Sequence, residues 1–180
     1  TNDKYYGENL MYAGNIDFID IQSKSGLDLS MLNNKNNIAY IYIISFIQNE
    51  NLKNFNSAQD WSLAIDEILE DLLPVDGLII DIRNNAGGYE GNLHRILSRF
   101  ISSKKHIYTS FTRNGSGKND FKENKYYLEP SNNAYNGPIV LLTDRGSSSC
   151  GDLFALGLED EKHVIQVGQH TRGVLSKAIT

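Results

Sequence analysis

Three apolar runs of strand length, each followed by a polar turn that contains glycine, constrain the fold of this chain more than any other feature. The runs and their turns are residues 75–82 with 83–88, 138–143 with 144–146, and 163–167 with 168–173. Segments with helical spacing separate them, so strands alternate with helices along the chain. This alternation predicts an α/β fold in which helices flank a mostly parallel central sheet. Ligands of such sheets bind at the carboxyl ends of the strands, where all three turns lie.

Helical spacing is clearest in three segments. In the first, Ser57 is a candidate N-cap, Pro74 lies beyond the end, and the apolar positions are Trp61, Ile65, Ile68, Leu69 and Leu72. In the second, which follows residues 83–88, they are Leu93, Ile96, Leu97 and Phe100. The third begins near Ser149 and is expected to pack through Leu153, Phe154, Leu156 and Leu158.

The remaining strands are predicted from alternation and apolar content. Residues 38–46 are apolar on both faces, which predicts cover on both sides of that strand. Residues 16–21 alternate as a half-buried strand, and residues 107–112 form another. Residues 113–136 are predicted as a long loop, which either borders a substrate groove or forms a disordered surface flap.

Length and composition bound the organisation and the partners of the chain. Its 180 residues fit one domain with a single core. We expect residues 1–36 to be a lead-in strand and loop, or the end of an upstream domain, and residues 37–180 to be the core. With 17 basic and 22 acidic residues the net charge is -5. The sequence has no basic stripe of the kind that would indicate nucleic-acid binding. No apolar run reaches about 18 residues, so no membrane span is predicted.

Cys150 is the single cysteine, which excludes an internal disulfide and a cysteine-rich metal site. We predict no metal and no cofactor. A thiol at a helix N-terminus could itself be a nucleophile, because that position stabilises the thiolate.

The turn after residues 138–143 carries Gly146, three serines and Cys150 before the third helix begins. A serine at a helix N-terminus lies beside free backbone N–H groups and the positive end of the helix dipole. An oxyanion that forms at Ser149 could therefore be bound by the Cys150 amide. The simpler interpretation is that these serines only cap the helix.

Gly87 and Gly88 end the turn that follows residues 75–82. Glycines allow a positive φ and a close backbone approach, so that amides can point at a ligand, although any tight turn can use them too. Taken together, two amide-presenting turns follow two strands, and an oxyanion hole needs donors from two directions.

The chain resembles the S41 serine peptidases, the C-terminal processing (tail-specific) and tricorn-like proteases. The resemblance lies in three blocks of sequence that agree in order and spacing, and it extends from Asn37 to Gly173 with the 38–46 strand that opens such cores. The blocks are residues 77–88 (GLIIDIRNNAGG), residues 140–143 with 149–155 (VLLT and SCGDLFA), and residues 167–173 (VGQHTRG). It implies a ClpP/crotonase-like fold.

The resemblance also implies roles for individual residues. Ser149 takes the place of the nucleophile, with the oxyanion hole assigned to the amides of Cys150 and of the Gly87–Gly88 turn. Asp152, Asp160 and Thr171 fall where the family carries supporting residues, although an aspartate in a first helical turn also favours the helix dipole. The substrate implied is a peptide or an unfolded protein, and the location implied is extracytoplasmic, in the periplasm or cell envelope.

The general base is where the chain departs from the processing proteases. They place a lysine directly after the glycine of the last block, and Val174 stands there instead. Three sources remain open for a base within hydrogen-bond reach of the serine. They are a histidine upstream of this chain, as the tricorn-like branch uses, or Lys177, or His170.

Two functions of different classes are consistent with the sequence. The first is a serine endopeptidase that acts through an acyl-enzyme on Ser149. The second is a binding module that keeps the fold and has lost turnover, because the lysine is missing. A crotonase-type acyl-CoA enzyme is a weaker third, since it has no use for the serine turn. The cleavage specificity and the oligomeric state are not set by the sequence.

Overall fold

The computed structural model describes residues 4–6, 11–16, 37–47 and 58–176, which build a six-stranded central sheet and a separate two-stranded one. The central sheet has the order β1-β2-β3-β4-β7-β8. Its strands are β1 (Lys4–Tyr6), β2 (Met11–Ile16), β3 (Ile38–Ile43), β4 (Gly77–Asp81), β7 (Ile139–Thr143) and β8 (Val164–Gly168). Neighbouring strands from β3 to β8 run parallel, whereas β1 and β2 add antiparallel pairs. The predicted α/β fold with a mostly parallel sheet is confirmed.

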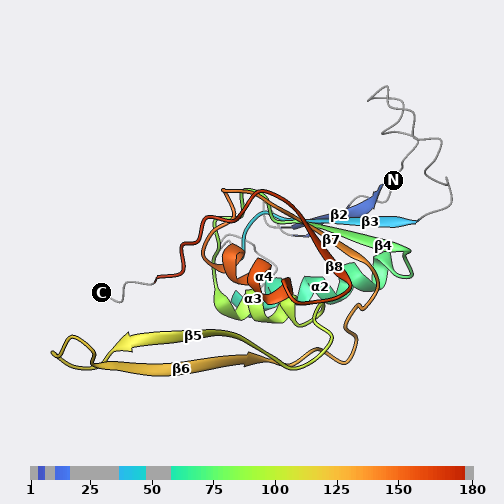
Figure 1. Cartoon of the computed structure of the whole chain (residues 1–180). Helices are drawn as coiled ribbons and strands as arrows, with labels where there is room; N and C mark the ends of the chain where they lie inside the picture. Colours follow the sequence, from blue (N-terminus) through green and yellow to red (C-terminus); the bar gives the residue numbers. More distant parts are fainter. Residues whose placement is uncertain (1–3, 7–10, 17–36, 48–57, 177–180) are drawn as a thin grey trace.

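Three described helices pack against one face of this sheet (Figure 1). They are α2 (Ala58–Leu72), α3 (Glu90–Leu97) and α4 (Cys150–Leu158). Each was predicted from its apolar spacing, and the described apolar positions are buried or, for Leu72, partly buried against the core, with one exception. That exception is Leu156, which was expected on the packed side of α4 and is 40% exposed.

In the part of the chain that the structure describes, helices cover only one face of the sheet, which differs from the cover on both sides predicted for residues 38–46. Ala39, Ile41 and Ile43 are fully buried toward the helices. Successive side chains of a strand point to opposite faces, so Tyr40 and Tyr42 lie on the other face, where they are only half-buried. The tyrosine hydroxyls explain why an apolar-looking strand tolerates this exposure, because an aromatic ring with a polar end suits a half-wet surface.

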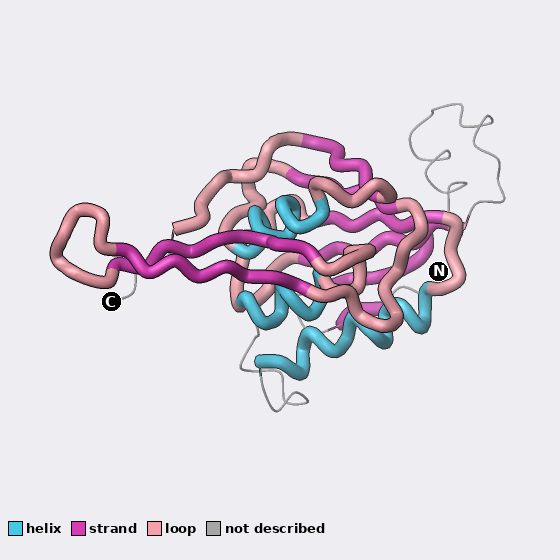
Figure 2. Tube along the Cα trace, turned by 60° about the horizontal axis from the view of Figure 1, so that its bottom comes forward, coloured by secondary structure: helices cyan, strands magenta, loops and turns pink. Residues whose placement is uncertain are grey.

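Residues 105–128 form a β-hairpin, not the long loop predicted for residues 113–136. Strand β5 (Lys105–Arg113) pairs antiparallel with β6 (Phe121–Leu128), and Figure 2 shows the hairpin extending beyond the helices. Its apolar side chains are largely exposed, among them Phe111 and Phe121. Strand β6 therefore gives no strong apolar alternation in the sequence, and the cross-strand hydrogen bonds that form it are not readable from composition.

Some expectations fall on residues that the structure does not describe. The predicted N-cap Ser57 lies outside the described residues, and so does most of the strand predicted at 16–21. Strand β2 pairs with β3, so residues 11–16 extend the sheet ahead of the predicted core boundary. The division of the chain at residue 36 stays a prediction. None of the described helices is both long and apolar enough to cross a bilayer.

Phe154 provides a direct test of the packing between α4 and the rest of the core. It is fully buried, with its ring centroid 5.7 Å from that of Phe46 and 6.4 Å from that of Phe100. We expect Phe154→Ala to lower the free energy of unfolding by about 3 to 5 kcal/mol, because it leaves a cavity. Phe111→Ala is the matched control; that side chain is 63% exposed, and its loss should change stability by less than about 0.5 kcal/mol. Urea denaturation measures both, and equal effects would contradict this packing.

Candidate active site

The turn between β7 and α4 presents Ser149 to solvent. Ser149 is exposed, whereas its neighbours Ser148 and Cys150 are 8% and 2% exposed. Its backbone has φ 57° and ψ −116°, a conformation that residues with a Cβ rarely adopt. Such strain costs on the order of 1 to 3 kcal/mol and persists only where surrounding contacts impose it. Contacts around this turn therefore have to hold Ser149 in place.

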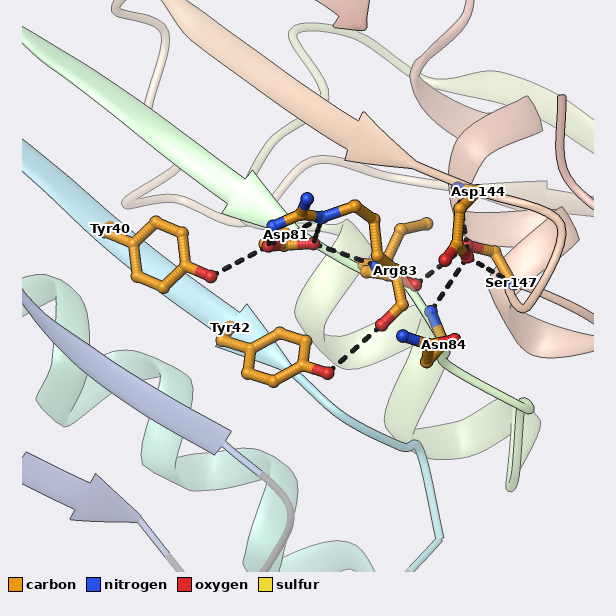
Figure 3. A network of polar contacts seen from close by, with 8 residues as sticks. Tyr40, Tyr42, Asp81, Arg83, Asn84, Asp144 and Ser147 are labelled. Atoms are coloured by element: carbon orange, nitrogen blue, oxygen red, sulfur yellow. Dashed lines mark hydrogen bonds and ion pairs between the residues drawn. The ribbon is translucent and has the colours of Figure 1, made fainter. Parts of the chain in front are cut away.

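Asp144 organises the serine turn and joins it to the turn after β4. Its carboxylate accepts hydrogen bonds from the backbone N–H groups of Gly146 at 2.9 Å and Ser147 at 3.1 Å, and from that of Asn84 at 2.8 Å. These bonds, the one from Asn84 above all, hold the pKa of Asp144 below its usual range. The Ser147 hydroxyl also donates to the Ile82 carbonyl at 2.8 Å. Figure 3 shows Asp144 between Asn84 and Ser147.

Gly87 lies directly against Ser149. A Cβ at Gly87 would come within 2.7 Å of the Ser149 Cβ and 3.0 Å of the Cys150 nitrogen, and its φ of +96° also favours glycine. The Ser148 N–H donates to the Asn85 carbonyl at 2.8 Å, which joins the same two turns a second time. The two turns that the sequence placed at the ends of separate strands are thus in contact.

The two glycines differ in what their amides do. The Gly87 N–H donates to the Asn85 side-chain oxygen at 2.8 Å, so it is already engaged. The structure shows no hydrogen bond from the Gly88 N–H to any described residue. The Gly88 carbonyl accepts a hydrogen bond from the Cys150 thiol, with Sγ and O 3.1 Å apart. Of the two glycines, Gly87 thus has its amide engaged and leaves room for Ser149 by lacking a Cβ.

Asp152 links the serine turn to the segment after β8. Its carboxylate accepts the N–H of Ser149 at 2.7 Å, that of Gly173 at 2.7 Å and that of Val174 at 3.0 Å. The side chain is nearly buried, so these charge-assisted bonds are shielded from water. We call residues 169–176 the strap. The backbone N–H of Arg172, which lies in the strap, donates to the Ser147 carbonyl at 2.8 Å. One carboxylate thus holds the strap against the serine.

The other predicted residues divide between the strap and positions away from it. Thr171 is half-buried and His170 is exposed, and both line a groove together with Asp152. Lys177 lies outside the described residues. Asp160 is exposed beyond the end of α4 opposite to Ser149, so it is not brought to the site. Among the described residues, no lysine or histidine side chain is hydrogen-bonded to the Ser149 hydroxyl.

An ion pair between a buried aspartate and an exposed arginine, beside the first glycine turn, was missed by the sequence reasoning. Asp81 is 1% exposed and accepts Nε and Nη2 of Arg83, at 2.9 and 2.6 Å for the shortest contacts, and the Tyr40 hydroxyl at 2.8 Å (Figure 3). Burial raises the pKa of Asp81, but the hydrogen bonds from Arg83 outweigh it and the net shift is downward. Burial raises the pKa of Tyr40, and the hydrogen bond to Asp81 raises it further. The signal that the sequence offered for this network was an aspartate, Asp81, at the end of a buried strand.

This network lines a small cavity of about 340 Å³ on the face away from the helices. Tyr42 completes it by donating to the Arg83 carbonyl at 3.2 Å. The residues hold the backbone of the β4 turn at the point where it leaves the sheet. Their contacts tie the start of the segment that leads to Gly87 to β3.

The fold and the site define a mixed α/β protein that presents a serine at a helix N-terminus beside a glycine turn. The sequence model of Peptidase family S41 matches residues 37–177. The chain therefore belongs to peptidase family S41. The narrower description of its fold as ClpP/crotonase-like stays a prediction.

Individual relatives agree with this membership. The chain is 27% identical over 144 residues to the carboxy-terminal processing protease CtpB of Bacillus subtilis (strain 168), covering 79% of this chain and 27% of CtpB. A structure described as a candidate peptidase from Parabacteroides merdae ATCC 43184 matches with a TM-score of 0.70 and 25% identity, over 97% of this chain and 47% of that one. The photosystem II D1 C-terminal processing protease shares the fold, with a TM-score of 0.56 and 22% identity over 77% of this chain and 32% of that chain. The chain spans less than half the length of each of these relatives.

Gly87→Ala tests the contact between the two turns. The added Cβ would meet Ser149 and would be strained at positive φ, so we expect a loss of about 1 to 3 kcal/mol in the free energy of unfolding. Gly91→Ala is the matched control, since a Cβ there meets nothing within 4 Å and lies in α3. That change should be neutral or stabilise by up to about 1 kcal/mol. Thermal and urea unfolding measure both, and a harmless Gly87→Ala would contradict the contact.

Asp144 is expected to make stability depend on pH. A carboxylate with a lowered folded-state pKa stabilises the protein above its unfolded value of about 3.9, and this stabilisation is lost as the pH falls through the folded value. Asp144→Asn should therefore lower the free energy of unfolding at pH 7 and reduce its fall between about pH 5 and pH 3. Asp160→Asn, at an exposed position, should follow the wild type. Urea titrations at each pH decide this, and an unchanged slope in Asp144→Asn would exclude the role.

Proposed function

We propose that this protein is a serine endopeptidase that cleaves peptide bonds through an acyl-enzyme on Ser149. The observation that supports the proposal is the contact of Gly87 with Ser149, an exposed serine at a helix N-terminus. Family membership supports a peptidase in general. The roles of Ser149 and of the residues around it are part of the proposal.

Ser149 is preferred to Cys150 as the attacking group. The Cys150 side chain is 2% exposed and its thiol is directed at the Gly88 carbonyl, whereas Ser149 is exposed. A nucleophile has to reach the carbonyl carbon of a substrate that arrives from solvent. The thiol instead helps to hold the glycine turn in place.

The oxyanion of the tetrahedral intermediate would be bound by the amides of Gly88 and Cys150. The Gly87 amide is not assigned as a donor, because it is bonded to Asn85. Gly87 contributes by lacking a Cβ where the turns touch. Loss of one such donor typically costs about 2.7 to 4 kcal/mol of transition-state stabilisation.

Asp152 and Thr171 are assigned to positioning. The Asp152 carboxylate fixes the Ser149 amide and the Gly173–Val174 amides at once, so the strap and the nucleophile keep one relative placement. Thr171 lies on the strap and lines the groove beside the serine turn. Neither residue touches the reacting atoms in this assignment.

The general base would be a side chain within hydrogen-bond reach of the Ser149 hydroxyl. Val174 occupies the family's lysine position and cannot take a proton, as the sequence indicated. The upstream histidine, Lys177 and His170 remain the alternatives. Of the three, only His170 lies in the described residues, on the exposed side of the strap.

The alternative function is a binding module of the same fold. The missing lysine favours it, since a serine without an activating base is a poor nucleophile. A fluorophosphonate probe separates the two functions, because rapid covalent labelling needs an activated serine. In either case we propose a peptide or unfolded protein as the ligand and, from the family resemblance, a location outside the cytoplasm.

Ser149→Ala tests the assignment. We expect it to abolish both cleavage of fluorescein-casein and fluorophosphonate labelling, while the urea midpoint stays within experimental error, because alanine keeps the same backbone constraints. Cys150→Ala is the control for the neighbouring thiol and should remain labelled. Undiminished turnover in Ser149→Ala would remove that residue from the mechanism. Absence of labelling in the wild type would favour the binding module.

A further inference from the structure

Leu156 is exposed in a helix that is otherwise buried. Every other residue of α4 from Cys150 to Leu158 is buried, whereas Leu156 is 40% exposed. A single exposed leucine is common on protein surfaces and needs no explanation by itself. Its surroundings are informative, because it lies in the wall of a groove.

The groove has a volume of about 770 Å³ and is bounded by α4, β8 and the strap. Its α4 wall consists of Asp152, Ala155, Leu156 and Glu159, which have the spacing of one helical stripe. The strap contributes Leu175, which is 56% exposed. Sites that bind small ligands or short peptide segments have volumes of about 300 to 1,000 Å³.

The groove reaches Asp152, the residue that holds the backbone of the proposed catalytic serine, although Ser149 itself does not line it. Asp152 lines its near end, and the same carboxylate accepts the Ser149 N–H at 2.7 Å. From there the groove follows α4 toward Glu159, a path of about 10 Å at 1.5 Å per helical residue. An extended polypeptide advances about 3.3 Å per residue, so the path suits about three residues.

Strand β8 offers a backbone edge along this path. It is the outermost strand of the described sheet on that side, and Gln166 and Gly168 of β8 line the groove. An extended peptide can add to such an edge through main-chain hydrogen bonds, which are independent of its sequence. Side-chain selection would then come from the groove walls.

We propose that this groove binds the substrate polypeptide on one side of the scissile bond, as an extended segment with an apolar side chain between Leu156 and Leu175. The inference rests on the proposed function for the scissile bond. It adds a substrate class, namely extended chains that carry an apolar residue a few positions from the cleavage site. Leu156 and Leu175 are specificity residues in this proposal and do not touch the reacting atoms.

The test separates binding in the groove from chemistry at the serine. In a Ser149→Ala background, fluorescence anisotropy measures binding of fluorescein-casein without turnover. Leu156→Trp fills the groove and should weaken binding at least tenfold, and Leu175→Asp should do the same from an exposed position that folding does not need. Leu73→Trp is the matched control, because Leu73 is 37% exposed just beyond α2 and outside the groove. It should bind as the background does.

The single variants with Ser149 intact complete the test. Fluorophosphonate labelling of Leu156→Trp and Leu175→Asp should stay within twofold of the wild type, since the probe is too small to need the groove. Unchanged casein binding in both groove variants, or a fall no larger than that of Leu73→Trp, would overturn the proposal. If the wild type is not labelled, the proposed chemistry fails, but the binding comparison still decides the groove.

Discussion

The contact between two backbone turns at the ends of β4 and β7 is the constraint on which the rest of this structure depends. Neighbouring parallel strands end at the same edge of a sheet, so the turns are brought together by topology. Their separation is then set by Gly87, which has no Cβ to push Ser149 away. The Asp144 carboxylate binds amides of both turns and keeps them in register.

A second carboxylate extends this arrangement to the end of the chain. Asp152 holds the strap by two amides and the strained Ser149 by a third, so the serine turn and the strap share one acidic group. Charge-assisted bonds to backbone amides are strong when shielded from water, and both aspartates use them. The positive φ of Ser149 is consistent with this, because a strained residue persists only where its neighbours leave it no alternative.

The parallel strands of the sheet, the helices and the two turns could be predicted because their signals are local, whereas the antiparallel strands β1 and β2 were not predicted. Apolar runs, helical spacing and paired glycines each describe a few neighbouring residues. The predictions that failed concern features that depend on tertiary contacts. The hairpin strand β6 is mostly exposed and shows little alternation, the face of β3 that carries Tyr40 is covered by no described helix, and Leu156 faces a groove that the strap helps to form. Likewise, the engagement of the Gly87 amide by Asn85 has no sequence signature, so the donor could be assigned to the turn but not to one glycine.

The most direct test of the account is a crystal structure of the protein after reaction with a fluorophosphonate, whose adduct resembles the tetrahedral intermediate. The account predicts a phosphorus atom bonded to Ser149 Oγ and a phosphonyl oxygen within about 2.7 to 3.1 Å of the amide nitrogens of both Gly88 and Cys150. An adduct on another residue, or a phosphonyl oxygen that points away from the glycine turn into solvent, would contradict it.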